Sequence, residues 1–235
     1  MKKIEKKIIF YCLYIYMSTT LSNQLFYTMH EYWLCYEHSP KKIKSSVSFF
    51  NINDAEKVKT IKIIFNQILI KYNFNNTNLL SFKDDTNIIV FVLDFIVIKV
   101  YSLHKYNMIK DIINITHESI EKTLEIFFTD NIVIVVNEKV LPLLTCTGDL
   151  NQNINWEQVQ KEQIYDNITN ALNKIHKLGY LHNDVSLDNI GLKIINKVYH
   201  FILFDFGASI KVSDNSLYIL EFEKLSKSIY RYLSS

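Results

Sequence analysis

Two short polar segments in the last third of the chain carry residue types that phosphate chemistry requires. Asp184 and Asn189 lie on a loop after a helix-like segment. Asp205 lies at the end of an apolar stretch, and Gly207 allows the chain to turn away from that stretch. A hairpin between the segments would return Asp205 to Asn189. Their hard oxygen atoms suit a hydrated Mg²⁺ that carries phosphates, and Asp184 is placed to accept a hydroxyl proton. Either segment alone is typical of a turn, but both in this order favour a site.

These segments resemble two motifs of the protein-kinase family. His182-Asn-Asp184-Val-Ser-Leu-Asp-Asn189 is similar to the catalytic loop H-x-D-x-x-x-x-N, and Asp205-Phe206-Gly207 matches the DFG motif. The resemblance implies an ATP- and Mg²⁺- (or Mn²⁺-) dependent phosphotransferase of the serine/threonine kinase type. It makes Asp184 the catalytic base and Asn189 and Asp205 the metal ligands, with His182 packed beneath Phe206.

The resemblance extends less specifically toward the N-terminus. Val97-Ile98-Lys99 is similar to the V-A-I-K strand, which would make Lys99 the lysine that binds the α- and β-phosphates. Its carboxylate partner is expected on the following helix, where we predict Glu118, with Glu121 as the alternative. Leu143–Gly148 resembles the hinge whose backbone would meet adenine.

Three departures from the family pattern are visible. No glycine precedes Gly148, so the expected glycine-rich loop is missing, and Lys83 is the candidate substitute donor. Ser186 stands where serine/threonine kinases carry a lysine, in a loop that is instead similar to that of RIO-type atypical kinases. Only 28 residues follow Gly207, which is too few for a usual activation loop and the remaining helices. We therefore expect a small, atypical member with a truncated C-lobe.

These departures leave the function open between three alternatives. The first is the phosphotransferase, acting on a protein substrate. The second is a weak or inactive pseudokinase, a binding module that regulates a partner kinase. The third is a small-molecule kinase, because a short C-lobe leaves little platform for a peptide.

The order of the elements predicts an α+β chain with a two-lobed, kinase-like fold. Residues 1–78 form an extension that we expect to be mostly helical, with a helix over about 54–72. The N-lobe covers about 79–144 and the C-lobe about 149–235. The periodicity predicts the elements that follow: strands over 87–93 and 95–101, a helix over 105–127, a strand pair over 132–136 and 140–144, a helix over 156–178, a hairpin over 190–204 and a helix over 216–233.

The composition narrows the partners and the compartment. The formal net charge of +2 argues against a broad nucleic-acid-binding face. The three cysteines form no disulfide framework, and the apolar run over 8–17 is too short to cross a bilayer, so we expect an intracellular, cytoplasmic protein without a membrane partner. A zinc site at His30, Glu31, Cys35 and His38 is conceivable, but the aromatic residues around them favour a packed helix face.

Overall fold

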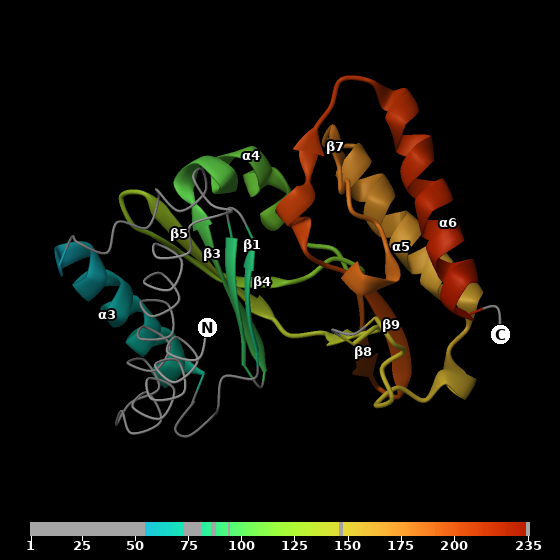
Figure 1. Ribbon diagram of the computed structural model, residues 1–235, viewed down its shortest axis with the longest axis horizontal. Helices are drawn as coiled ribbons and strands as arrows, with labels where there is room; N and C mark the ends of the chain where they lie inside the picture. Colours follow the sequence, from blue (N-terminus) through green and yellow to red (C-terminus); the bar gives the residue numbers. More distant parts are fainter. Residues whose placement is uncertain (1–54, 73–80, 86–87, 94, 146–147, 234–235) are drawn as a thin grey trace, which may run out of the picture. The chain divides into compact units, whose positions relative to one another are not determined.

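The computed structural model describes residues 55–72, 81–85, 88–93, 95–145 and 148–233 (Figure 1). It is a mixed α+β structure and divides into two compact units. The N-terminal unit comprises residues 1–102 and 127–134, and the C-terminal unit comprises residues 103–126 and 135–235. The metal-binding cluster considered at His30, Glu31, Cys35 and His38 lies outside the described residues.

A five-stranded sheet has the order β1-β2-β3-β5-β4. The strands are β1 (Ser81–Asp85), β2 (Ile88–Val92), β3 (Ile96–Ser102), β4 (Thr123–Phe128) and β5 (Ile132–Glu138). The first three pair antiparallel, and Lys99 of β3 lies opposite Val90 of β2. β2 and β3 confirm the two strands predicted there. Their apolar and β-branched residues suit a sheet that is covered by other elements.

Helix α3 (Ala55–Lys71) packs against this sheet, as its apolar stripe predicts. Phe65 and Ile68 are fully buried on that stripe. The ring of Phe65 meets Phe91 of β2 edge-on, with 5.8 Å between the centroids. The helix predicted over about 54–72 is therefore confirmed.

The helix predicted over 105–127 is wrong in its second half. Helix α4 (Leu103–Ile113) ends early, and a turn over 114–120 leads into β4. Asn114 follows the helix, and its backbone amide and side-chain amide both donate to the carbonyl of Lys110, at 3.1 Å and 2.8 Å. Ile120 follows Ile113 by seven residues, which imitates helical spacing although the chain between them is irregular.

The C-terminal unit is built on two helices and a hairpin. Helix α5 (Lys161–His176) contacts both α6 (Tyr218–Leu233) and the hairpin of β8 (Ile190–Ile195) and β9 (Val198–Leu203) (Figure 1). The core between them is aliphatic, with Ile168, Leu172 and Leu225 fully buried. A short 3₁₀ turn, Trp156–Gln158, precedes α5, so the predicted helix begins later than residue 156.

The hairpin has the turn that the sequence predicts. Asn196 and Lys197 form it with positive φ angles of 52° and 67°, as type I′ turns require. The predicted pairing of 132–136 with 140–144 is wrong, because β6 (Leu141–Pro142) pairs antiparallel with β8. Gly191 permits this approach, since a Cβ there would lie 2.5 Å from Cγ2 of Val140.

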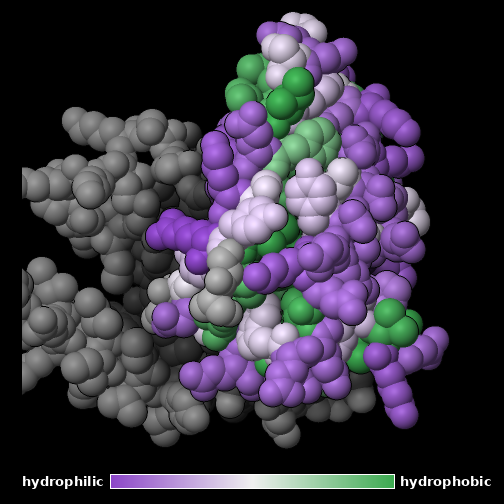
Figure 2. Space-filling view, turned by 90° about the vertical axis from the view of Figure 1, so that its right-hand side faces the viewer, coloured by the Kyte–Doolittle hydropathy of each residue, from purple (hydrophilic) through white to green (hydrophobic). Residues whose placement is uncertain are grey.

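The face of the molecule seen in Figure 2 is mostly hydrophilic, and its hydrophobic residues form small separate patches. Helix α6 exposes Ile219, Leu220 and Tyr230. None of the helices in the described part of the chain is long and apolar enough to cross a membrane.

Candidate functional site

The loop that carries Asp184 begins directly after α5. Gly179 ends the helix with a φ of 81°, and its amide donates to the carbonyl of His176 at 2.8 Å. The next two residues form β7 (Tyr180–Leu181), which pairs with β10 (Ile210–Lys211). The segment after Asp205 is thereby joined to the segment before Asp184.

Asn189 holds Asp184 in place. Its side chain is buried, and Nδ2 donates to the backbone oxygen of Asp184 and to its carboxylate Oδ2, both at 2.8 Å. The 3₁₀ turn Leu187–Asn189 is fixed to α6, because the hydroxyl of Ser228 accepts from the Leu187 amide at 2.9 Å. Asp184 itself remains exposed. Both Nδ2 hydrogens are engaged within the loop, so Oδ1 is the Asn189 atom suited to a ligand.

The β8–β9 hairpin returns the chain to Asn189, as predicted. The amide of Phe204 donates to the carbonyl of Asn189 at 3.0 Å, which places Asp205 one residue away. Asp205 has a left-handed backbone, with φ 63° and ψ 67°, and its Oδ1 accepts from the Gly207 amide at 3.4 Å. A left-handed conformation is uncommon for a residue other than glycine and concentrates at functional positions.

His182 is a structural residue of the site. It is fully buried, and its ring meets Phe206 edge-on with 5.1 Å between centroids, which confirms the predicted packing. Nε2 donates to the carbonyl of Phe204 at 3.0 Å. Burial lowers the pKa of His182, and the Phe204 carbonyl and the nearby carboxylates oppose this only in part. The ring is therefore neutral and supports the Asp205-Phe206-Gly207 turn from below.

Glu221 of α6 is the residue that the sequence analysis missed. It is 2% exposed, and its two oxygens accept from the backbone amides of His182 at 3.1 Å and Asn183 at 2.6 Å. His176 of α5 lies 2.8 Å from the same carboxylate through Nε2. A buried carboxylate thus clamps the backbone immediately before Asp184.

The hydrogen bonds to Glu221 determine the direction of its pKa shift. Burial alone would raise the pKa of Glu221, but the bonds from His176 and the two amides outweigh it, so the pKa of this carboxyl is lowered. The sequence contains a signal for this residue. Glu221, Leu225 and Ile229 are spaced by four, so a charged residue occupies the buried stripe of α6.

Lys99 and its predicted partner are placed differently. Lys99 lies on β3 as predicted and is 4% exposed. Glu118 lies on the turn after α4 rather than on a helix, and its side chain is exposed, whereas the alternative, Glu121, is buried. The lysine and both glutamates belong to different units, and the pairing stays a prediction.

Ser186 and Lys83 are the two residues that stand at positions where the chain departs from the protein-kinase pattern. The hydroxyl of Ser186 lies 3.4 Å from Asp188 and contributes no cation. β1 and β2 occupy the expected glycine-rich position, but the side chain of Lys83 is outside the described part.

The donors at Asn189 and Asp205 fit a magnesium ion. Mg²⁺ usually takes one or two protein oxygen ligands and completes its shell with water and substrate phosphates. An amide oxygen and a carboxylate on adjoining backbone segments provide that number. Within the described ranges, no three His, Cys, Asp or Glu side chains form a metal-binding group.

Comparison of the chain with protein-family models finds no match, and no curated protein matches it either.

Proposed function

We propose that the C-terminal unit is the catalytic half of an atypical, protein-kinase-like phosphotransferase that uses ATP and Mg²⁺. The observation that supports this most strongly is the double role of Asn189. Its side chain holds Asp184, and its carbonyl accepts from the residue before Asp205. One buried residue therefore joins a proton acceptor to a metal ligand.

Each residue of the proposed site has a separate role in the reaction. Asp184 takes the proton of a serine or threonine hydroxyl as the oxygen attacks the γ-phosphorus of ATP, and the bond to the β-phosphate oxygen breaks to release ADP. Bound Mg²⁺ would neutralise charge on the phosphates. Asn189 and Asp205 would hold it, and the kinase resemblance would make Lys99 of β3 a phosphate ligand.

The second candidate is a nucleotide-dependent binding module without turnover. It is favoured by the glycine-free connection between β1 and β2, because side chains keep backbone amides away from phosphates. Ser186 favours it as well, since it supplies no cation for the transferred phosphoryl group.

One paired titration tests the proposal and separates the candidates. The full chain is titrated with ATP and either Mg²⁺ or Mn²⁺, with thermal unfolding and autophosphorylation measured on the same samples. A metal-dependent rise in Tm with phosphate incorporation supports the enzyme, and a rise without incorporation supports the binding module. No rise with either metal would contradict both.

A further inference from the structure

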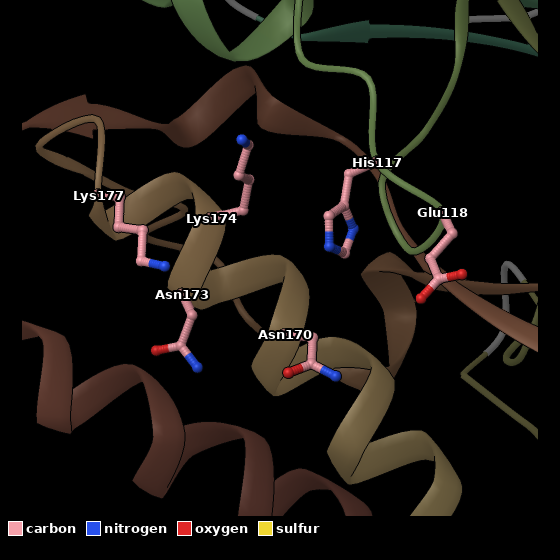
Figure 3. Close-up of a pocket in the computed structure, with 6 residues that line it drawn as sticks. All are labelled: His117, Glu118, Asn170, Asn173, Lys174 and Lys177. Atoms are coloured by element: carbon pink, nitrogen blue, oxygen red, sulfur yellow. The ribbon is translucent and has the colours of Figure 1, made fainter.

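An open cavity of about 330 Å³, lined by polar and charged residues, lies on the C-terminal unit between helix α5 and the turn over 114–120. The turn contributes two of its lining residues, helix α5 contributes three, and its C-cap residue, Lys177, contributes one (Figure 3). The lining residues are His117, Glu118, Asn170, Asn173, Lys174 and Lys177. Glu118 is also the predicted partner of Lys99, and the other five have no role in the proposed catalytic site.

The helix wall is one stripe of α5. Asn170, Asn173, Lys174 and Lys177 are spaced by three and four residues, so they share a face of the helix. All four are exposed, while the opposite stripe is buried in the core. A polar stripe is ordinary on a surface helix, but here the turn lies over it and makes it the wall of a cavity.

The backbone of the opposite wall is held by hydrogen bonds. Nδ1 of His117 accepts from the Ser119 amide at 3.1 Å, so the proton of the neutral ring is on Nε2, which can donate. The carbonyl of Ser119 accepts from the Leu203 amide of β9 at 2.9 Å, and the Glu121 amide donates to the Leu203 carbonyl at 2.9 Å. The turn is therefore anchored to the hairpin, which fixes the backbone next to His117 and Glu118.

The charges around the cavity do not neutralise one another. Among the described residues, no ion pair within 4.0 Å engages Lys174, Lys177 or Glu118. Figure 3 shows Lys177 and Glu118 at opposite ends of the lining, with Lys174 and His117 between them. The cavity has two cations against one anion, and the cations gather at one end.

We propose that this cavity binds a phosphoryl group at its lysine end. Two ammonium groups, the His117 Nε2–H and the carboxamides of Asn170 and Asn173 offer donors from two walls. A phosphate dianion has enough acceptor oxygens to use several of them, whereas a carboxylate has only two. The source is either a free phosphate compound or a phosphorylated side chain of a partner, and the chemistry at the cavity is the same.

A role for the two lysines in stabilising helix α5 alone predicts a different result. Lys174 and Lys177 lie at the C-terminal end of α5, where cations complement the helix dipole. In that role, their removal would weaken the helix slightly and would leave phosphate binding unchanged.

The test is a titration of the full chain with inorganic phosphate, without nucleotide or metal, followed by NMR of the His117 and Ser119 amides. Wild type should show saturable shifts. Lys174→Gln and Lys177→Gln should each weaken binding by about three- to tenfold, because each removes a charged donor. Glu118→Gln should strengthen it by about two- to fivefold, because it removes a repelling charge. Lys224→Gln on the exposed surface of α6 is the matched control and should leave it unchanged.

The opposite effects of the lysine and glutamate variants exclude misfolding as the cause. Chemical shifts that do not saturate with phosphate and that are equal in wild type and Lys174→Gln would overturn the proposal. It would also be overturned if Lys224→Gln weakened phosphate binding as much as Lys174→Gln does. A capped Gly-Ser-Gly peptide with phosphorylated serine, beside its unphosphorylated form, distinguishes the sources. Tighter binding of the phosphopeptide than of inorganic phosphate supports a partner's side chain, and the reverse order supports a free phosphate compound.

Discussion

The carboxylate of Glu221 accepts the backbone amide of Asn183 at 2.6 Å, one residue before Asp184. The same carboxylate accepts from His182 and lies against His176, so α6, α5 and the loop meet at a single buried group. The position of Asp184 therefore depends on a residue of α6, the next α-helix along the chain.

Glu221→Gln should destabilise the protein by about 2–4 kcal/mol, because an amide nitrogen would face donors that have no other partner. Urea unfolding at pH 7 measures this. Glu223→Gln is the matched control, since Glu223 is exposed and, among the described residues, pairs only with Lys227 at 3.7 Å, and it should change stability by less than about 0.5 kcal/mol. Equal effects of the two substitutions would contradict the clamp.

The buried His182 predicts a loss of stability in mild acid. Because burial lowers its folded pKa, the unfolded chain takes up the proton first, and stability falls as pH drops below the unfolded value of about 6.5. The loss levels off below the folded pKa, and the contribution of Glu221, whose pKa is also lowered, is lost only at still lower pH. Urea unfolding between pH 8 and pH 5 should show a slope of up to about 1.4 kcal/mol per pH unit from His182.

His182→Gln should flatten that slope, because glutamine has no proton to gain. His104→Gln should keep the wild-type slope, since His104 is exposed on α4. An unchanged slope in His182→Gln would show that another group causes the acid sensitivity.

Asp184→Asn should separate binding from chemistry. The carboxylate acts on the acceptor hydroxyl rather than on the nucleotide, so ATP affinity should stay near wild type while turnover falls by about 10²–10⁴-fold. Equilibrium titration and single-turnover assays measure the two quantities. Comparable losses in both would mean that Asp184 serves the nucleotide site instead.

The sequence predicts the parts of this site that local pattern determines. The hairpin that returns Asp205 to Asn189 is predicted from the turn at Asn196-Lys197 and two apolar strands. The spacing of Asp184 from Asn189 follows directly from the sequence. The packing of His182 under Phe206 follows from the kinase resemblance and is confirmed by the ring contact.

What the sequence does not predict depends on contacts far along the chain. Glu221 is one of two acidic residues in α6, and only its place on the buried stripe distinguishes it. The end of α4 at Ile113 is marked by no glycine or proline, so the spacing of the apolar residues does not reveal it. The pairing of β6 with β8 requires Gly191 to accommodate Val140, which is a tertiary contact.

The most direct test of the account is metal-dependent ATP turnover by wild type and Asp205→Asn. Asparagine also tolerates the left-handed conformation at this position, so the variant should keep its fold and lose only the charged metal ligand. We predict Mg²⁺-dependent phosphate transfer by wild type and none above background by Asp205→Asn, with both proteins folded by circular dichroism. Turnover that persists undiminished in Asp205→Asn would contradict the assignment of the site.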